Sequence, residues 1–216
     1  MLDKLEFDEV CIMTEKELML SEQLYIANDA ELAKDNAKAR KLTRLINTAT
    51  EAQVEYRLEL FRELFGSIGN TFWIEPPFRT DYGCNTYIGD NFYANYDCIF
   101  IDVAKIDIGN NVFFGPRVCL YTAGHPIDAE IRNKQLEYGK NIKIGNDVWV
   151  GGNTVINPGV TIGDNVVIGS GSVVTKDIPG GVIAAGVPCR VIRKITEEDT
   201  AYWKKQAEAY YNNKTL

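Results

Sequence analysis

The chain contains a single histidine, His125, and the imidazole of histidine is the side chain that most often serves as a general base. It stands in the run YTAGHPID, where a regular repeat of the sequence stops and a longer insertion begins. An imidazole at the mouth of a loop can take a proton from a bound hydroxyl group and act as a general base. The chain has no Gly-x-Ser-x-Gly elbow and no cysteine near His125 in sequence, which disfavours a covalent nucleophile. His125 is therefore the candidate base.

The repeat that ends at this histidine has a period of six residues. Apolar residues keep this spacing through a two-residue slip and one interruption; they are Ile88, Ala94, Phe100, Ile106, Ile108, Phe114, Leu120, Ile144, Val150, Ile156, Ile162, Ile168 and Val174. A period of six is neither the helical period nor plain strand alternation. It is typical of the hexapeptide repeat of a parallel β-helix, in which stacked coils bury one continuous apolar column.

A second set of apolar residues often follows the first by four places: Phe92, Cys98, Val112, Val118, Val148, Val160 and Val166. Gly, Asn and Asp surround these positions, as in Gly109-Asn110-Asn111, and we predict that they turn the corners of the coils, where positive φ is common. A series of ordinary hairpins is the alternative. Hairpin loops do not hold a register of six over this length, so the β-helix is favoured.

Three helical segments precede the repeat. The run Thr14 to Glu17 has the form of a capping box. A second helix is expected from about Asp29 to Ile46. A second capping-box pattern at Thr50–Gln53 opens a third helix, which Gly66 ends.

These patterns predict a mainly β chain that is divided into four segments. We expect a disordered extension at 1–12, a helical N-terminal region at 13–69, a β-helix at 70–195 and a C-terminal helix at 196–216. The segment 125–141 interrupts the repeat and should protrude as a loop. The last helix carries possible packing residues, namely Tyr202, Trp203, Tyr210 and Tyr211. We expect the helical parts to cap the two open ends of the β-helix, since exposed strand edges pair with other chains.

The composition narrows the function classes. The 216 residues carry a net charge of −7, which argues against broad nucleic-acid binding. No apolar run reaches about 18 residues, so no membrane span is expected, and the first residues do not resemble a signal peptide. Five scattered cysteines without a C-x-x-C disfavour a disulfide framework or a structural zinc site. The chain is therefore predicted to be cytoplasmic.

Several runs resemble one family of enzymes. They are FYANYDC at 92–98, TAGHPID at 122–128, IGNDVWVGG at 144–152, INPGVTIG at 156–163, VVTKDIP at 173–179 and AGVPCRVI at 185–192. Over roughly residues 13–195 the chain is similar to the maltose and galactoside O-acetyltransferases, and its helical start is closer to the maltose branch. This resemblance implies a homotrimer of left-handed parallel β-helices with active sites between subunits. It also implies acetyl-CoA as co-substrate and a small sugar as acceptor.

The resemblance assigns roles to individual residues. His125 would take the proton from a sugar hydroxyl while that oxygen attacks the thioester directly. The Gly152 backbone N–H would stabilise the oxyanion, and Asn95 would orient the acceptor or the imidazole. Four residues match positions that line the acceptor pocket in relatives: Tyr93, Asp102, Glu137 and Trp149. The alternatives are outward packing for Tyr93 and Trp149, a corner turn for Asn95 and a solvated side chain for Asp102.

The phosphates of CoA require cations on this acidic chain. The resemblance assigns cofactor contacts to Gly152, Ser170, Thr175, Lys176, Arg190 and Arg193, although these cations could also belong to a solvated charged face. No metal is expected, because one histidine cannot supply the three imidazoles that zinc carbonic anhydrases of β-helical fold use.

The sequence leaves the acceptor open. The sugar could be maltose, glucose or a galactoside, because small changes in a hydroxyl-lined pocket shift specificity without leaving a motif. A related acetyltransferase with a xenobiotic, serine or lipo-oligosaccharide acceptor is a second hypothesis. A non-catalytic β-helical trimer is a third, against which His125, Asn95 and the Thr175-Lys176 pair speak together.

Overall fold

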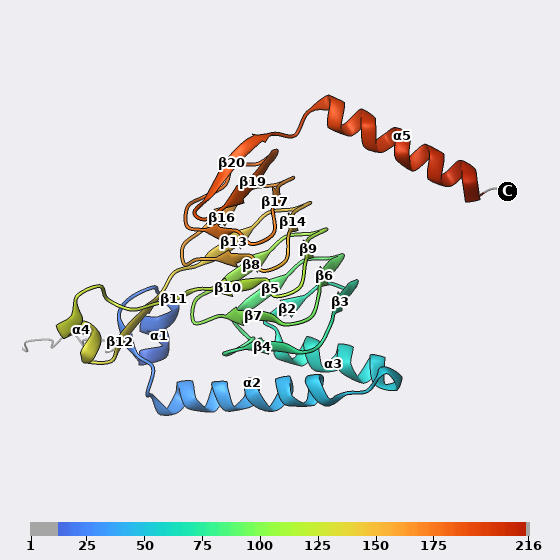
Figure 1. Ribbon diagram of the computed structural model, residues 1–216. Coiled ribbons are helices and arrows are strands. Elements are labelled where there is room, and N and C mark those ends of the chain that lie inside the picture. Colours follow the sequence, from blue (N-terminus) through green and yellow to red (C-terminus); the bar gives the residue numbers. More distant parts are fainter. Residues whose placement is uncertain (1–12, 215–216) are drawn as a thin grey trace, which may run out of the picture.

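A computed structural model describes residues 13–214, so the extension predicted at 1–12 lies outside the described residues. Short parallel strands stack into three sheets that form the sides of a prism (Figure 1). The β8 face contains β2 (Ser67–Ile68), β5 (Thr86–Ile88), β8 (Ile106–Ile108), β13 (Ile142–Ile144) and β16 (Thr161–Ile162). The β6 face contains β3 (Phe72–Ile74), β6 (Phe92–Ala94), β9 (Phe113–Phe114), β14 (Trp149–Val150), β17 (Val167–Ile168), β19 (Val182–Gly186) and β20 (Cys189–Lys194). The β7 face contains β4 (Phe78–Thr80), β7 (Cys98–Ile101), β10 (Cys119–Tyr121), β15 (Val155–Ile156) and β18 (Val173–Val174).

The interior of the prism is built from the six-residue repeat. Every repeat position predicted from the sequence is buried, and so is every position of the second apolar set. Strands of successive coils pair in parallel with inward residues stacked on one another, as Thr86, Ile106 and Ile142 do on the β8 face. The predicted parallel β-helix is thereby confirmed.

The corner between the β8 and β6 faces is held by a ladder of amide and carboxylate side chains. The backbone N–H of Asp90 donates to Asn110 Oδ1 at 2.8 Å, and that of Asn110 donates to Asn146 Oδ1 at 2.9 Å. The N–H of Asn146 donates to Asp164 Oδ1 at 2.6 Å. The residue after each rung has positive φ, as at Asn111. Asn and Asp tolerate this conformation, which confirms their predicted place at corners.

Helices cover the first coils. They are α1 (Glu15–Leu20), α2 (Ala30–Thr48), the 3₁₀ turn η1 (Glu51–Gln53) and α3 (Val54–Leu64). Both predicted capping boxes are present, at Thr14 and Thr50, and Asp29 caps α2. The buried faces of α2 and α3 join the same apolar core as the coils, through Ile46 and Phe61 among others. The broad end of the prism is therefore closed by these helices.

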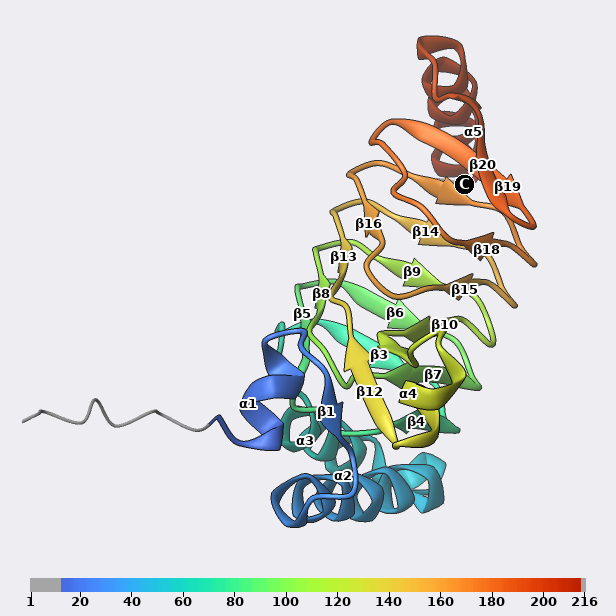
Figure 2. The ribbon, with the colours of Figure 1, turned by 90° about the vertical axis from the view of Figure 1, so that its left-hand side faces the viewer.

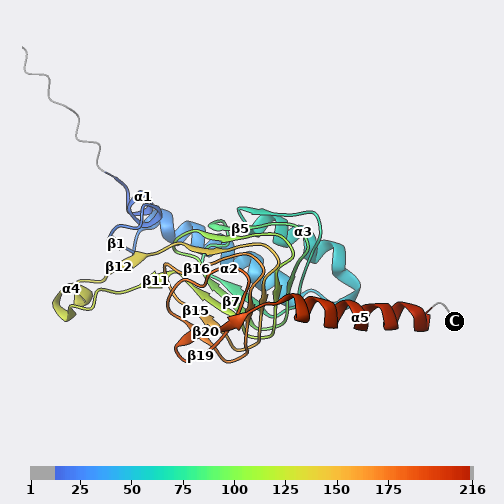
Figure 3. The same cartoon turned by 90° about the horizontal axis from the view of Figure 1, so that it is seen from above.

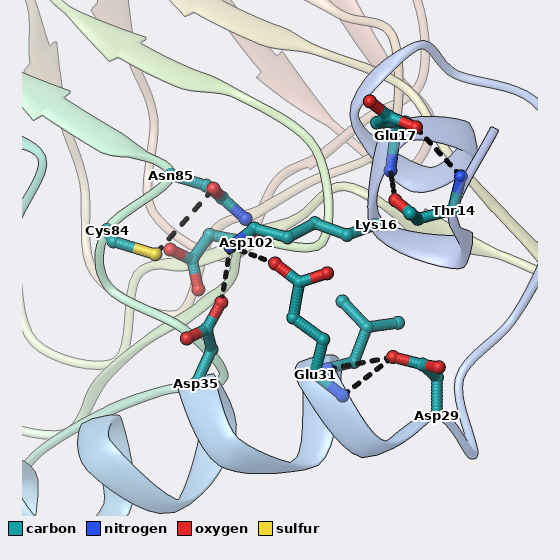
Figure 4. Close-up of polar contacts among 10 residues, drawn as sticks. Thr14, Lys16, Glu17, Asp29, Glu31, Asp35, Cys84, Asn85 and Asp102 are labelled. Carbon is teal, nitrogen blue, oxygen red and sulfur yellow. Dashed lines mark hydrogen bonds and ion pairs between the residues drawn. The ribbon is translucent and has the colours of Figure 1, made fainter. Parts of the chain in front are cut away.

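Helix α1 is joined to α2 by the ion pairs of one lysine. Lys16 Nζ lies 2.7 Å from Asp35 and 3.1 Å from Glu31, one turn apart on α2 (Figure 4). The hydrogen bonds to the two carboxylates raise the pKa of Lys16, so its charge is held at all ordinary pH values. This contact sets the position of the N-terminal region beside the first coil.

The segment predicted to protrude leaves the coil as expected (Figure 2). It is more regular than a loop, because it contains α4 (Ala129–Asn133) and β12 (Leu136–Gly139). Strand β12 pairs antiparallel with β11 (Ala123–Gly124) and with β1 (Tyr25–Ile26) of the N-terminal region. This pairing between distant segments leaves no local signal in the sequence.

The C-terminal helix α5 (Glu197–Lys214) forms as predicted, but the prediction that it caps the prism is wrong. It runs away from the prism (Figures 1 and 3) and buries none of its residues. Its aromatic residues are 53–67% exposed. The β6 face is extended beyond β17 by the antiparallel hairpin of β19 and β20 instead. No helix in the described part of the chain is long and apolar enough to cross a membrane.

Candidate active site

The predicted site residues fall on two different corners of the prism. Asn95, Gly152 and Ser170 follow strands of the β6 face, at the turn into the β7 face; we call this set the Asn95 corner. Consecutive coils are in close contact there. A Cβ added to Gly115 would lie 2.5 Å from Gly152 N, and one added to Gly151 would lie 2.5 Å from Ser170 N. Backbone N–H groups at this corner are therefore closely stacked along the prism.

The second set lies where the β7 face turns into the β8 face. The chain leaves the prism there after Thr122 to carry His125, and Thr175 and Lys176 occupy the same corner after β18. We call His125, Thr175 and Lys176 the His125 corner. The β7 face separates the two corners, and the four residues of β7 alone span about 10 Å. One copy of the chain thus does not bring Asn95 and His125 together.

The imidazole of His125 is open to a ligand. Its side chain is exposed and forms no hydrogen bond within residues 13–214. The backbone that follows is held firmly, since Arg132 Nη1 donates to Pro126 O and Ile127 O, both at 2.9 Å. Asp128 Oδ1 accepts from Ile131 N at 2.9 Å and caps α4. The loop is therefore shaped by its own contacts and leaves the imidazole free.

Glu137 lies on β12 beside a buried tyrosine. Tyr25 Oη donates to Glu137 Oε2 at 3.1 Å. Burial, and then the charge of Glu137, raise the pKa of Tyr25 well above its ordinary value, so the phenol stays protonated and donates. Burial likewise raises the pKa of Tyr82 to about 12, with Asp81 and Glu137 adding to the effect. Glu137 is therefore one of a group of buried and half-buried polar residues.

Tyr25, Asp81 and Tyr82 are members of this group that the sequence did not single out. Burial raises the pKa of Asp81, the charge of Arg40 lowers it, and the charge of Glu137 raises it again. Because these residues come from β1, the turn after β4 and β12, only the folded chain places them together.

Asp102 does not line an open pocket, so that expectation is corrected. Its side chain is fully buried. Its carboxylate accepts from Thr80 Oγ1 at 2.7 Å, Tyr82 N at 2.9 Å and Thr86 Oγ1 at 3.2 Å. Its backbone oxygen accepts from the neighbouring Asn85 Nδ2 at 2.7 Å; both residues are drawn in Figure 4. Asp102 organises the turn that carries Asp81 and Tyr82, and it contacts no solvent.

Tyr93 and Trp149 lie on the outer surface of the β6 face. Pairing places them in one outward row with Trp73 and Phe113. Tyr93 is half-buried and Trp149 is 56% exposed. The row runs beside the Asn95 corner, since Asn95 follows Tyr93 by two residues. It offers an aromatic wall to whatever lies against that corner.

The Gly152 amide fits the role of an oxyanion donor. Gly152 is buried, and its N–H forms no hydrogen bond to any described residue. A Cβ at this position would lie 2.9 Å from Pro116 O, so only glycine fits the corner. An unpaired N–H at a rigid corner can stabilise a developing negative charge without reorganisation.

The predicted cofactor cations differ in availability. Lys176 is exposed and makes no ion pair with the described residues. Arg190 is exposed, and its Nη1 donates only to the Cys189 backbone oxygen, at 2.7 Å. Arg193 is engaged already, because its two Nη atoms donate to Asp199 at 2.6 and 2.9 Å. Lys176 and Arg190 are therefore the better candidates for a phosphate.

Comparison with known proteins identifies the family of the chain. The maltose acetyltransferase hexapeptide capping motif matches residues 18–69, and the bacterial transferase hexapeptide repeat matches residues 141–176. The galactoside O-acetyltransferase of Escherichia coli K12 is 47% identical over 174 residues, which are 81% of this chain and 86% of that protein.

Two solved structures extend the similarity to three dimensions. A maltose O-acetyltransferase from Clostridium difficile 630 superposes with a TM-score of 0.85 at 57% identity, over 85% of this chain and 98% of that one. A galactoside acetyltransferase in complex with coenzyme A superposes with a TM-score of 0.84 at 43% identity, over 88% and 94% of the two chains. With its repeat, its helical cap and the run around His125, the chain belongs to the maltose and galactoside O-acetyltransferase family of hexapeptide acetyltransferases.

Proposed function

We propose that the protein transfers the acetyl group of acetyl-CoA to a hydroxyl of a small sugar, with His125 as general base. The observation that carries this proposal is the exposed imidazole, which has no hydrogen-bond partner among residues 13–214, on a loop whose backbone is fixed by its own contacts. His125 removes the hydroxyl proton as the oxygen attacks the thioester carbonyl. The Gly152 N–H stabilises the oxyanion. Collapse breaks the C–S bond, and the departing thiolate takes the proton from the imidazolium.

The proposed active site is assembled from two copies of the chain, in a homotrimer. The Asn95 corner of one copy and the His125 corner of the next would form one site, because neither corner holds all the groups. The outer rows of the prism support this arrangement. The β6 face presents Trp73, Tyr93, Phe113, Trp149, Val167 and Ile183. The β7 face presents Ile99, Cys119, Val155 and Val173, with Arg79 at the end of the row beside the helices. The β8 face presents Tyr87, Asp107, Lys143 and Thr161.

Two different apolar faces and one mostly polar face suit a ring. In such a ring the β6 face of one copy meets the β7 face of the next, and the contact closes after a fixed number of copies. The polar β8 face then remains in water. A twofold dimer would instead need a single self-complementary face.

The substrates follow from the chemistry of the two corners. Glu137 can accept hydrogen bonds from sugar hydroxyls, while Tyr93 and Trp149 can pack against the apolar face of a sugar ring. Asn95 can orient the acceptor through its amide. Acetyl-CoA would lie along the prism, with Ser170, Thr175, Lys176 and Arg190 at its polar groups. The coenzyme A complex of the galactoside acetyltransferase supports this assignment of the co-substrate.

Two inactive variants, mixed, test the reaction and the shared site together. The measurement is the release of the CoA thiol from acetyl-CoA with maltose, glucose or a galactoside as acceptor. His125→Ala and Asn95→Ala should each lower this release. Serine and chloramphenicol are tested beside the sugars as non-sugar acceptors. Equal amounts of the two variants are then dissociated and reassembled together. Each shared site needs an intact His125 from one copy and an intact Asn95 from the next, and each of these is present in half of the copies. About one quarter of the wild-type activity should therefore return. Mixtures that stay inactive would place both residues in one copy. Release with serine or chloramphenicol only would reject the sugar acceptor.

A further inference from the structure

The Asn95 corner carries a second polar side chain, that of Glu75, one coil before Asn95. Glu75 follows β3 as Asn95 follows β6, and the two strands pair in parallel with Ile74 opposite Ala94. The backbone N–H of Glu75 donates to Ala94 O at 2.9 Å, so the two residues are stacked about 4.8 Å apart. The coils that follow have glycine at the equivalent position: Gly115, Gly151 and Gly169. Polar side chains therefore stand at the end of this column that is nearest the helices.

The carboxylate of Glu75 is held by one of its two oxygens. Trp73 Nε1 donates to Glu75 Oε1 at 2.6 Å. The Trp73 ring is itself held by Arg57 of α3, whose guanidinium carbon lies 5.1 Å from the ring centroid. Arg57 is 6% exposed, so this cation–π contact is shielded from water. The other oxygen of the half-buried Glu75, Oε2, has no hydrogen-bond or ion-pair partner in the described part of the chain. It is available to a ligand that donates a hydrogen bond.

The amide of Asn95 is held in the same way. Tyr96 N donates to Asn95 Oδ1 at 2.8 Å, and Asn95 Nδ2 has no partner among residues 13–214. Burial, and then the charge of Glu75, raise the pKa of Tyr93, so the carboxylate also lies near that phenol. An oriented donor, an oriented acceptor and an aromatic ring thus lie together beside the outer row of the β6 face.

We propose that Glu75 is a further acceptor-binding residue, which accepts a hydrogen bond from a second hydroxyl of the sugar beside the hydroxyl that Asn95 orients. Each hydroxyl of a sugar can donate one hydrogen bond and accept others, as this donor and acceptor one coil apart require. The inference rests on the proposed function, in which acetyl-CoA extends along the later coils to Ser170 and leaves the coil of Glu75 to the acceptor. It narrows the acceptor class to a compound with neighbouring hydroxyls and disfavours an isolated alcohol.

Acetylation kinetics of Glu75→Gln test this assignment. Glutamine keeps an oxygen for Trp73 Nε1, so the melting temperature should stay near the wild-type value. The Michaelis constant for the sugar should rise about tenfold, because a hydrogen bond to a charged group is weakened, while that for acetyl-CoA should not change. Glu59→Gln is the matched control, since Glu59 is an exposed acid of α3. It should change neither constant.

Deoxy sugars separate contact with the acceptor from support of Trp73. The sugar is glucose or methyl galactoside, whichever the wild type acetylates faster, and each analogue lacks one hydroxyl other than the acetylated one. One analogue should lower kcat/KM of the wild type by about tenfold or more. The same analogue should lower kcat/KM of Glu75→Gln much less, because two changes to one contact are not additive.

Trp73→Phe is a second variant, which keeps a ring under Arg57 and removes the N–H that holds Glu75. It should raise the Michaelis constant for the sugar several-fold, and it replaces Glu75→Gln in the test if that variant does not fold. Unchanged sugar kinetics in both variants, or equal losses for every analogue in wild type and Glu75→Gln, would overturn the inference while sugar acetylation by the wild type stands. A wild type that acetylates neither sugar would reject the proposed function and the inference with it.

Discussion

The hydroxyl of Tyr25 and the carboxylate of Glu137 are joined at 3.1 Å although 112 residues separate them in the chain. The two residues also face each other in register across the β1–β12 pair. This contact ties the N-terminal region to the inserted segment, whose other end carries His125. The position of the loop that carries His125 therefore depends on a residue that precedes the prism.

Tyr25→Phe should loosen this connection while keeping the ring packed. We expect about 1 kcal/mol less stability in urea unfolding, because Glu137 loses a hydrogen bond in a half-buried setting. The Michaelis constant for the acceptor should rise more than turnover falls. Tyr56→Phe, at an exposed tyrosine of α3, is the control and should change neither. A Tyr25→Phe enzyme with wild-type stability and kinetics would show that the contact is dispensable.

Asp102→Asn should change the pH dependence of stability. Burial raises the pKa of Asp102 above its value in the unfolded chain, about 3.9. Below that value both states are protonated. As pH rises from about 4, the unfolded state ionises first and wild-type stability falls relative to the variant.

The measurement is a series of denaturant unfolding curves from pH 3 to 7. The advantage of Asp102→Asn over wild type should grow with pH across this range. Asp102→Ala, in contrast, should cost about 3 kcal/mol, because it leaves Tyr82 N–H and the Thr80 and Thr86 hydroxyls without their acceptor. A pH-independent difference between Asn and Asp would mean that Asp102 titrates normally.

Ile162→Asp should destroy the prism, since this inward side chain is 1% exposed and an unpaired charge would enter the core. Thr161→Asp is the matched control: it places the same charge one residue earlier, on the outward side, opposite Lys143. Circular dichroism and soluble yield should separate the two variants. Folded, active Ile162→Asp protein would contradict the register of the coils.

His125→Ala should lower turnover by about a hundredfold or more, because the proposed general base is removed. Its side chain is exposed, so the melting temperature and the oligomer size should stay at wild-type values. Ile127→Ala, at a 97% exposed position of the same loop, controls for disturbance of the loop. A loss of folding in His125→Ala would assign the residue a structural role instead.

Gly115→Ala should impair the proposed oxyanion donor from the neighbouring coil. The added Cβ would lie 2.5 Å from Gly152 N, so the amide must move. Turnover should fall about tenfold or more, as loss of a positioned donor does in acyl transfer.

Gly109→Ala provides the comparison for this glycine. Its Cβ would approach Gly145 O to 2.7 Å, a similarly tight contact at the corner between the β8 and β6 faces, away from the site. It should reduce stability without a matching loss of turnover in the folded fraction. Equal kinetic effects of the two variants would remove the special role given to Gly152.

The two errors of sequence interpretation have physical causes. Asp102 follows β7; the family resemblance placed it in the acceptor pocket, and a solvated side chain was the alternative. The fold surrounds it with Thr80, Thr86 and the Tyr82 N–H from neighbouring coils, which permits its burial. For α5, the aromatic residues suggested packing, but the β19–β20 hairpin extends the β6 face at this end instead.

The sequence by itself determined the prism, its corners and the helices beside it. A six-residue period states directly which side chains point inward, and Asn, Asp and Gly mark the turns by their backbone preferences. Only the tertiary structure decided which polar residues are in contact. It separates Asn95 from His125, which lie on opposite edges of the β7 face, and it brings Tyr25 into a hydrogen bond with the distant Glu137. Such contacts arise from the stacking of coils and the pairing of β1 with β12, and no local spacing of residues encodes them.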